Sequence, residues 1–107
     1  MRVTASMVAY AIVDVEIHDI EQFLVYQKEL APLLSAAGAQ YLARGGQFRV
    51  YEGDYTPDRL LVLEFPSLEA MDSFYDSDEY HALDAQREAC SSCRVIAVEG
   101  LPLPAAG

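Results

Sequence analysis

Apolar and polar residues alternate near the start of the chain, and this alternation predicts a β-strand over residues 7–17, "MVAYAIVDVEI". Every second residue is apolar, whereas the residues between them mix apolar, aromatic and acidic side chains. One face of the strand is therefore suited to a core and the other is not. The apolar face holds Ala11, Val13, Val15 and Ile17, and the mixed face holds Tyr10, Ile12, Asp14 and Glu16.

The pattern then changes to helical spacing. Asp19 is a typical N-cap residue, and Gln22 three positions later completes a capping-box pattern. Gly38 is expected to end the helix, because glycine readily adopts the left-handed conformation found there. The apolar stripe of this predicted helix consists of Ile20, Phe23, Leu24, Leu30 and Leu34.

The segment "YLARGGQFRVYEGDY", residues 41–55, has the composition of an extended strand but contains Gly45 and Gly46 at its middle. Paired glycines inside a strand predict a β-bulge, which would bend the strand and re-aim the side chain of Arg44. Two interpretations of Arg44 stay open: it faces the mouth of a cavity, or it pairs with a nearby acid. "GDYTPDR", residues 53–59, is then expected to turn the chain.

The second half of the chain repeats the strand and helix patterns. "RLLVLEF", residues 59–65, alternates as a strand, and Ser67 is placed to cap the following helix. Ser77 is expected to cap a second helical piece that continues to Arg87. "RVIAVEG", residues 94–100, predicts the last strand.

The predicted order β-α-β-β-α-β indicates an α+β, ferredoxin-like fold: a four-stranded antiparallel sheet with both helices on one face. We expect one domain over residues 1–107, with a core at about 8–100 and a tail at 101–107. The uncovered sheet face would be half apolar, which is typical of an association surface or a ligand groove. Two copies facing each other through their sheets would form a homodimer and enclose a cavity in each subunit.

Composition narrows the classes of partner. Seventeen acidic residues against seven basic ones give a net charge of −10, which disfavours nucleic acid and anionic membrane surfaces. No apolar run reaches the length of a membrane-spanning helix, and the first residues lack the layout of a signal peptide, so a cytoplasmic location is expected. "CSSC", residues 90–93, has redox-motif spacing but follows a predicted helix instead of starting one, which favours a packing role.

The chain resembles a widespread bacterial family, domain-of-unknown-function family 1330. The resemblance runs from about Tyr10 to Gly100 and is carried by "YLARGG", "YEGD", "LVLEFPSLEAMDSFYDSDEYHAL" and the closing "VEG". It implies a dimeric α/β barrel of two ferredoxin-like protomers, with a cavity lined from the open sheet face. Related barrel families include cofactor-free monooxygenases, isomerases, decarboxylases and ligand binders, and fold alone does not choose among them.

Matching residue by residue, the resemblance assigns Arg44, Gly45 and Gly46 to the family's Arg-Gly-Gly and Arg87 to its downstream arginine. Asp78 stands where a proline is usual in the family, and the segment from Cys90 to Cys93 replaces a run of small residues.

Candidate chemistry follows from residue type and predicted face. Asp14 and Glu64 are expected on neighbouring central strands, where a partly apolar cavity would raise the pKa of a carboxyl group and suit it to act as a general base. Arg44 would stabilise an oxyanion and His81 could exchange protons near neutral pH. The alternatives are a structural ion-pair network for the carboxylates and an exposed helix position for His81. Residues predicted to contact a ligand are Tyr10, Tyr26, Tyr80 and Arg87, whereas Tyr75 is expected to pack in the core.

Three functions remain open at this point. The first is a cofactor-independent enzyme that acts on a small carbonyl, enol or phenolic acid. The second is a binding protein that holds a small anionic or carbonyl ligand in the same cavity without turnover. The third is an interaction module whose open face serves only dimerisation. The scattered histidines show no metal-ligand spacing, and no cofactor motif is present.

Overall fold

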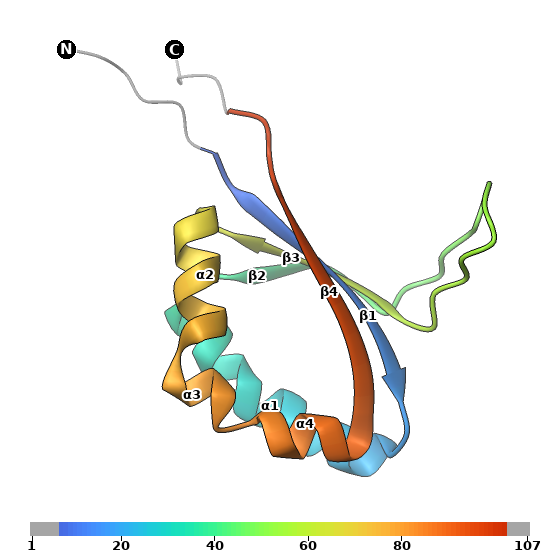
Figure 1. Ribbon diagram of the computed structural model, residues 1–107, viewed down its shortest axis with the longest axis horizontal. Coiled ribbons are helices and arrows are strands. Elements are labelled where there is room, and N and C mark those ends of the chain that lie inside the picture. The colour runs from blue at the N-terminus through green and yellow to red at the C-terminus, as the bar shows by residue number, and fades with distance from the viewer. Residues whose placement is uncertain (1–6, 103–107) are drawn as a thin grey trace.

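The computed structural model describes residues 7–102, which form an antiparallel four-stranded sheet with all helices on one face (Figure 1). The order β2-β3-β1-β4 places β1 and β3 at the centre. This is the predicted ferredoxin-like arrangement. Of the predicted tail, residues 103–107 lie outside the described part of the chain. The elements are β1 (Ala9–Ile17), α1 (Ile20–Ala36), β2 (Gln40–Arg44), β3 (Leu60–Phe65), α2 (Leu68–Asp76), α3 (Asp78–His81), α4 (Asp84–Cys90) and β4 (Ser91–Glu99).

The predicted helix caps are present. The side chain of Asp19 accepts a hydrogen bond from the backbone N–H of Gln22 at 3.2 Å. Ser67 and Ser77 accept equivalent bonds, at 3.0 and 3.1 Å, from the third residue after each of them. These caps satisfy N–H groups that a helix start otherwise leaves unpaired. The second predicted helix is divided into α2, α3 and α4, and within residues 7–102 no helix is long and apolar enough to cross a membrane.

The core lies between the helices and one face of the sheet. Of the apolar face predicted for β1, Ala11, Val13 and Val15 are buried and Ile17 is partly buried, and the alternate residues of β3 are buried against the same helices, where the tilted rings of Phe65 and Phe74 lie with centroids 5.4 Å apart. The alternation read from the sequence therefore assigned the faces of both central strands correctly. The buried set on these strands includes Ala11, Val13, Val15, Leu61, Leu63 and Phe65.

The other face of the sheet is open and partly apolar. Ile12 of β1 lies opposite Val62 of β3 on one side and opposite Ile96 of β4 on the other. Ile96 and Val98 are 65% and 52% exposed. We call the open-face surface formed by Ile12, Val62, Ile96 and Val98 the apolar patch.

The connection between β2 and β3 differs from the prediction. β2 ends at Arg44, and residues 45–59 form a long loop, the β2–β3 loop, that projects from the end of the sheet (Figure 1). The register shift in β2 lies between Tyr41 and Ala43, so the bulge predicted at the paired glycines is wrong. Gly45 instead has φ of +70°, which turns the chain out of the strand while its N–H donates to the Leu60 carbonyl at 2.8 Å.

Candidate functional site

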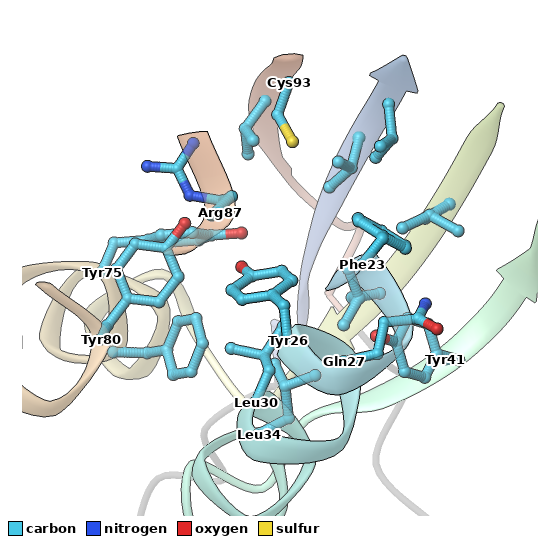
Figure 2. Close-up of a pocket in the computed structure, with 16 residues that line it drawn as sticks. Phe23, Tyr26, Gln27, Leu30, Leu34, Tyr41, Tyr75, Tyr80, Arg87 and Cys93 are labelled. Carbon is cyan, nitrogen blue, oxygen red and sulfur yellow. The ribbon is translucent and has the colours of Figure 1, made fainter. Parts of the chain in front are cut away.

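A pocket of about 50 Å³ lies inside the protomer, between the helices and the covered face of the sheet (Figure 2). Its walls are largely apolar, because the inward alternation of the strands faces the apolar stripes of α1 and α2. The sequence predicts a cavity lined by the open face of the sheet, whereas this pocket lies against the opposite, helix-covered face. The apolar wall includes Val13, Val15, Leu61 and Leu63 from the sheet and Phe23, Leu30, Leu34 and Phe74 from the helices.

One end of the pocket is polar. Tyr26 comes from α1, Tyr75 from α2, Tyr80 from α3 and Arg87 from α4. Figure 2 shows their hydroxyl groups and the guanidinium gathered on the same side of the pocket. The rings of Tyr75 and Tyr80 meet edge to face with centroids 5.0 Å apart, and the Arg87 guanidinium carbon lies 6.0 Å from the Tyr80 ring centroid. Because the second predicted helix is divided into α2, α3 and α4, these three helices and α1 each contribute one polar side chain to this end of the pocket.

These polar groups all remain hydrogen-bond donors. Burial raises the pKa of Tyr26, of Tyr75 and of Tyr80, so the three hydroxyl groups keep their protons. Burial acts to lower the pKa of Arg87, but the hydrogen bond to Asp84 and the electrostatic influence of Tyr80, Tyr26 and Cys93 together outweigh it and raise that pKa above its usual value. The Nε atom of Arg87 is buried and has no hydrogen-bond partner among the described residues. A buried donor of this kind is costly unless something accepts from it.

Asp84 holds Arg87 from outside the pocket. Its Oδ1 accepts a hydrogen bond from an Arg87 terminal nitrogen at 3.0 Å, and its Oδ2 lies 2.9 Å from Nδ1 of His81. That second bond raises the pKa of His81, an exposed side chain that does not line the pocket. His81 therefore contacts the polar end only through Asp84.

A wider groove of about 470 Å³ adjoins the pocket along the edge strand β4. The groove and the pocket share Tyr75, Tyr80, Arg87 and Cys93 as a common wall, together with Val95. The two spaces are therefore separated by side chains alone. Beyond this wall the groove is lined by Met71, Asp72 and Ala97.

Asp14 lies on the open face and anchors the β2–β3 loop. Its carboxylate accepts hydrogen bonds from the Tyr55 hydroxyl and from the backbone N–H groups of Asp58 and Arg59, the latter two at 2.9 and 3.3 Å. The Tyr55 bond lowers the pKa of Asp14 and outweighs the desolvation that acts to raise it. The expectation of a raised pKa at Asp14 is therefore wrong in sign, because donors from a loop reach the carboxylate.

Glu64 and Asp14 share the open face but do not form a pair. In the register of β1 with β3, Asp14 is opposite Leu60, whereas Glu64 is opposite Tyr10. The carboxylates are thus separated by four positions along the strands, about 13 Å. Glu64 Oε1 instead accepts a hydrogen bond from Gln40 at 3.1 Å.

Arg44 lies over the ring of Tyr41, with its guanidinium carbon 4.9 Å from the ring centroid. It is opposite Leu61 in the register, on the helix-covered side of the sheet, and so does not share a face with Asp14. Its contact with the pocket is through Tyr41, which lines the wall.

The predicted residues are therefore divided between two faces. Tyr26, Tyr80 and Arg87 meet at the polar end of the pocket, whereas Asp14, Glu64 and Tyr10 lie on the open face.

Two groups that line the pocket were not predicted from the sequence as part of a site: the hydroxyl of Tyr75 and the thiol of Cys93. The alternation of β4 could have placed Cys93 inward, since it is opposite the buried Val15. Both thiols of the Cys-x-x-Cys segment are free.

Residues 8–101 match the family described as "Domain of unknown function (DUF1330)". The chain belongs to this family. Its structure is similar to that of RPA0582, a protein of unknown function from Rhodopseudomonas palustris, with 17% identity, 92% of this chain and 85% of that chain covered, and a TM-score of 0.73. No curated protein compared with this DUF1330 chain matches it significantly.

More distant structures share the fold of this DUF1330 chain. A dimeric ferredoxin-like protein of unknown function from Thermobifida fusca has 19% identity and a TM-score of 0.56, with 94% of this chain and 95% of that chain covered. SnoaB, a cofactor-independent oxygenase from Streptomyces nogalater, has 11% identity and a TM-score of 0.57, with 95% and 100% covered. At these identities the likeness concerns the fold alone.

Proposed function

We propose that the protein binds a small, largely apolar compound in the pocket between its helices and sheet, with an oxygen atom of that compound at the polar end. The observation that carries this proposal is the buried Nε of Arg87, which has no acceptor among the described residues and lines the same pocket as the buried Tyr26 and the partly buried Tyr75 and Tyr80. Groups of this kind at the end of an apolar pocket are typical of sites that orient a ligand.

The chemistry of the polar end favours a ligand oxygen that accepts hydrogen bonds. The guanidinium can only donate, and the tyrosine hydroxyl groups keep their protons because burial raises their pKa values. The nearest carboxylate, that of Asp84, is already engaged by Arg87 and His81. A carbonyl, an enolate or a phenolate fits such a set of donors, and a positive charge nearby favours the ionised form.

The finer form of this proposal is a cofactor-independent enzyme that acts on a small enol, phenol or carbonyl compound. Stabilising an oxyanion is the contribution that such a donor set makes to catalysis. SnoaB, which shares the fold, supports this direction by analogy only. Binding without turnover is the alternative, and it uses the same residues.

Titration of 4-nitrophenol tests the site, because the ionised probe is coloured and the neutral one is not. We expect the Arg87 guanidinium to hold the apparent pKa of the bound probe about one unit lower than burial alone would set it, the size expected for a nearby opposite charge. Arg87→Met should remove this shift, and Arg87→Lys should restore only part of it, because lysine has no Nε donor in a planar fork. A bound probe that titrates identically with all three proteins would contradict the proposal.

We further propose that two copies associate through the open sheet face. The apolar patch on that face and the dimeric description of the Thermobifida fusca neighbour support this assembly. In such a dimer Asp14, Glu64 and Tyr10 would lie at or near the interface, as the sequence interpretation expected. The catalytic and ligand-binding roles predicted for these three residues would then belong to a cavity at the dimer interface and not to the pocket within the protomer.

A further inference from the structure

We propose that the ligand has two parts: an oxygen-bearing head in the pocket and an uncharged apolar extension in the groove along β4. This inference rests on the proposed function and specifies the class of ligand. The ligand would be a phenol or enol that carries a substituent several carbons long, and not a compound small enough for the pocket to enclose.

The volumes of the pocket and of the groove favour a ligand that has two parts. The pocket offers about 50 Å³, which is room for only a few water molecules at about 10–15 Å³ each on the same measure. Sites for complete organic ligands measure about 300–1,000 Å³. The groove supplies about 470 Å³ directly beside the pocket, so a ligand that uses both spaces reaches the usual size.

The wall between the two spaces shows where the extension would cross. Tyr75, Tyr80, Arg87 and Cys93 line both the pocket and the groove. A head whose oxygen accepts from Arg87 would therefore lie at the boundary, with the groove next to it. Side chains at such a boundary can change rotamer at a modest cost, whereas the strands and helices behind them stay in place.

The floor of the groove favours an apolar, uncharged extension. Val95 lines both spaces and is 41% exposed, and Ala97, also exposed, continues the same face of β4. Met71 contributes a side wall. Asp72 is the carboxylate that lines the groove, and it would repel a second negative charge on the ligand.

A series of 2-alkylphenols, from 2-methylphenol to 2-pentylphenol, tests the inference by isothermal titration calorimetry, because a chain at the 2-position leaves the ring beside the oxygen and so next to the groove. Each added methylene should tighten binding about two- to fourfold, because a buried methylene corresponds to about fourfold and the groove is partly open. The gain should stop when the extension leaves the groove.

Ala97→Trp fills the groove and should remove the gain with chain length while 2-methylphenol binds as before. Ala31→Trp, at an exposed position of α1 that lines none of these spaces, is the matched control and should keep the whole gain. Circular dichroism verifies that both variants fold. Equal affinity along the series, or the same loss in both variants, would overturn the two-part ligand while leaving the pocket proposal intact. If 2-methylphenol and its longer homologues all fail to bind, the proposed function itself fails, and the inference with it.

Discussion

At the scale of single residues, Asp14 shows how a carboxyl group predicted to have a raised pKa acquires a lowered one. Its carboxylate accepts three hydrogen bonds, from the Tyr55 hydroxyl and from the backbone of Asp58 and Arg59. All three donors belong to the β2–β3 loop. The carboxylate therefore joins the end of this loop to the central strand β1, and the lowered pKa of Asp14 is a consequence of that junction.

We expect Asp14→Asn to loosen the β2–β3 loop without unfolding the protein. The amide keeps the shape of the side chain but loses the charge that strengthens all three bonds. The cost in unfolding free energy should be about 1 kcal/mol or less, since the carboxylate is in contact with solvent. Hydrogen exchange at the Asp58 and Arg59 amides should become faster, whereas exchange at core amides of β1 should change little.

The difference in stability between wild type and Asp14→Asn should depend on pH in a known direction. The folded-state pKa of Asp14 lies below the ordinary value of 3.8, so its contribution to stability is present above that value and is lost as the pH falls through the folded-state pKa. Wild type and Asp14→Asn should therefore differ in stability at neutral pH, and the difference should shrink as the pH falls below about 4 and disappear below the folded-state pKa of Asp14. A variant that loses activity or ligand binding with unchanged loop exchange would instead make Asp14 a catalytic residue.

Residue type and periodicity predicted Tyr26, Tyr80 and Arg87 as ligand contacts, and these three lie together in the pocket. The same reasoning gave the wrong direction for the pKa shift of Asp14, because the donors to its carboxylate come from residues more than forty positions away. Alternation fixes the face on which a strand residue lies but not the loop that folds over it. A pKa shift depends on that loop and could not be read from the pattern.

At the scale of elements, the end of β2 depends on Gly45. Its φ of +70° is a conformation that other residues adopt at a cost, and a Cβ there would lie 2.3 Å from the Arg59 guanidinium carbon. Gly46 has no atom within 4 Å of the equivalent position and no positive φ. The two glycines look alike in the sequence, but the structure requires only the first of them.

Gly45→Ala should therefore destabilise the fold by about 1–2 kcal/mol, the cost of a left-handed conformation for a residue with a Cβ, and more if Arg59 cannot move aside. Gly46→Ala is the matched control and should change the unfolding free energy by no more than about 0.5 kcal/mol. Urea denaturation of both variants measures the difference. Equal effects of the two substitutions would show that the conformation of Gly45 does not limit the fold.

Local signals predicted the elements better than the spaces between them. Helix starts were predictable because the capping residues Asp19, Ser67 and Ser77 act on N–H groups within three positions. The position of the pocket depends on how side chains from α1, α2, α3 and α4 fill the volume over the sheet. That packing is a property of several distant segments together, and the sequence pattern of one segment does not contain it.

At the scale of the whole molecule, the covered and open faces of the sheet have different proposed roles: ligand binding within the protomer and association between protomers. The apolar patch is the feature that carries the second role, since Ile96 and Val98 expose more than half of their surface in the single chain. Contiguous apolar surface on a sheet face is a common mark of an association site.

Ile96→Asp should dissociate the proposed dimer, because it places a charge within the apolar patch in a chain that already carries a net charge of −10. Leu24→Asp is the matched control. Leu24 is 55% exposed but belongs to α1, on the side of the sheet away from the patch, so this variant should associate like wild type. Sedimentation equilibrium measures both.

The net charge supplies an independent check on the same assembly. Two acidic protomers repel each other, and salt screens that repulsion over a distance of about 8 Å at physiological ionic strength. The dimer should therefore tighten as salt is added, because burial of the patch is not weakened by salt whereas the opposing repulsion is. Dissociation on adding salt would mean that ion pairs hold the protomers together, and a wild-type protein that stays monomeric at high salt would exclude the patch as an interface. In that second case the pocket would still be available to a ligand, since the pocket lies within one protomer and does not need a second copy.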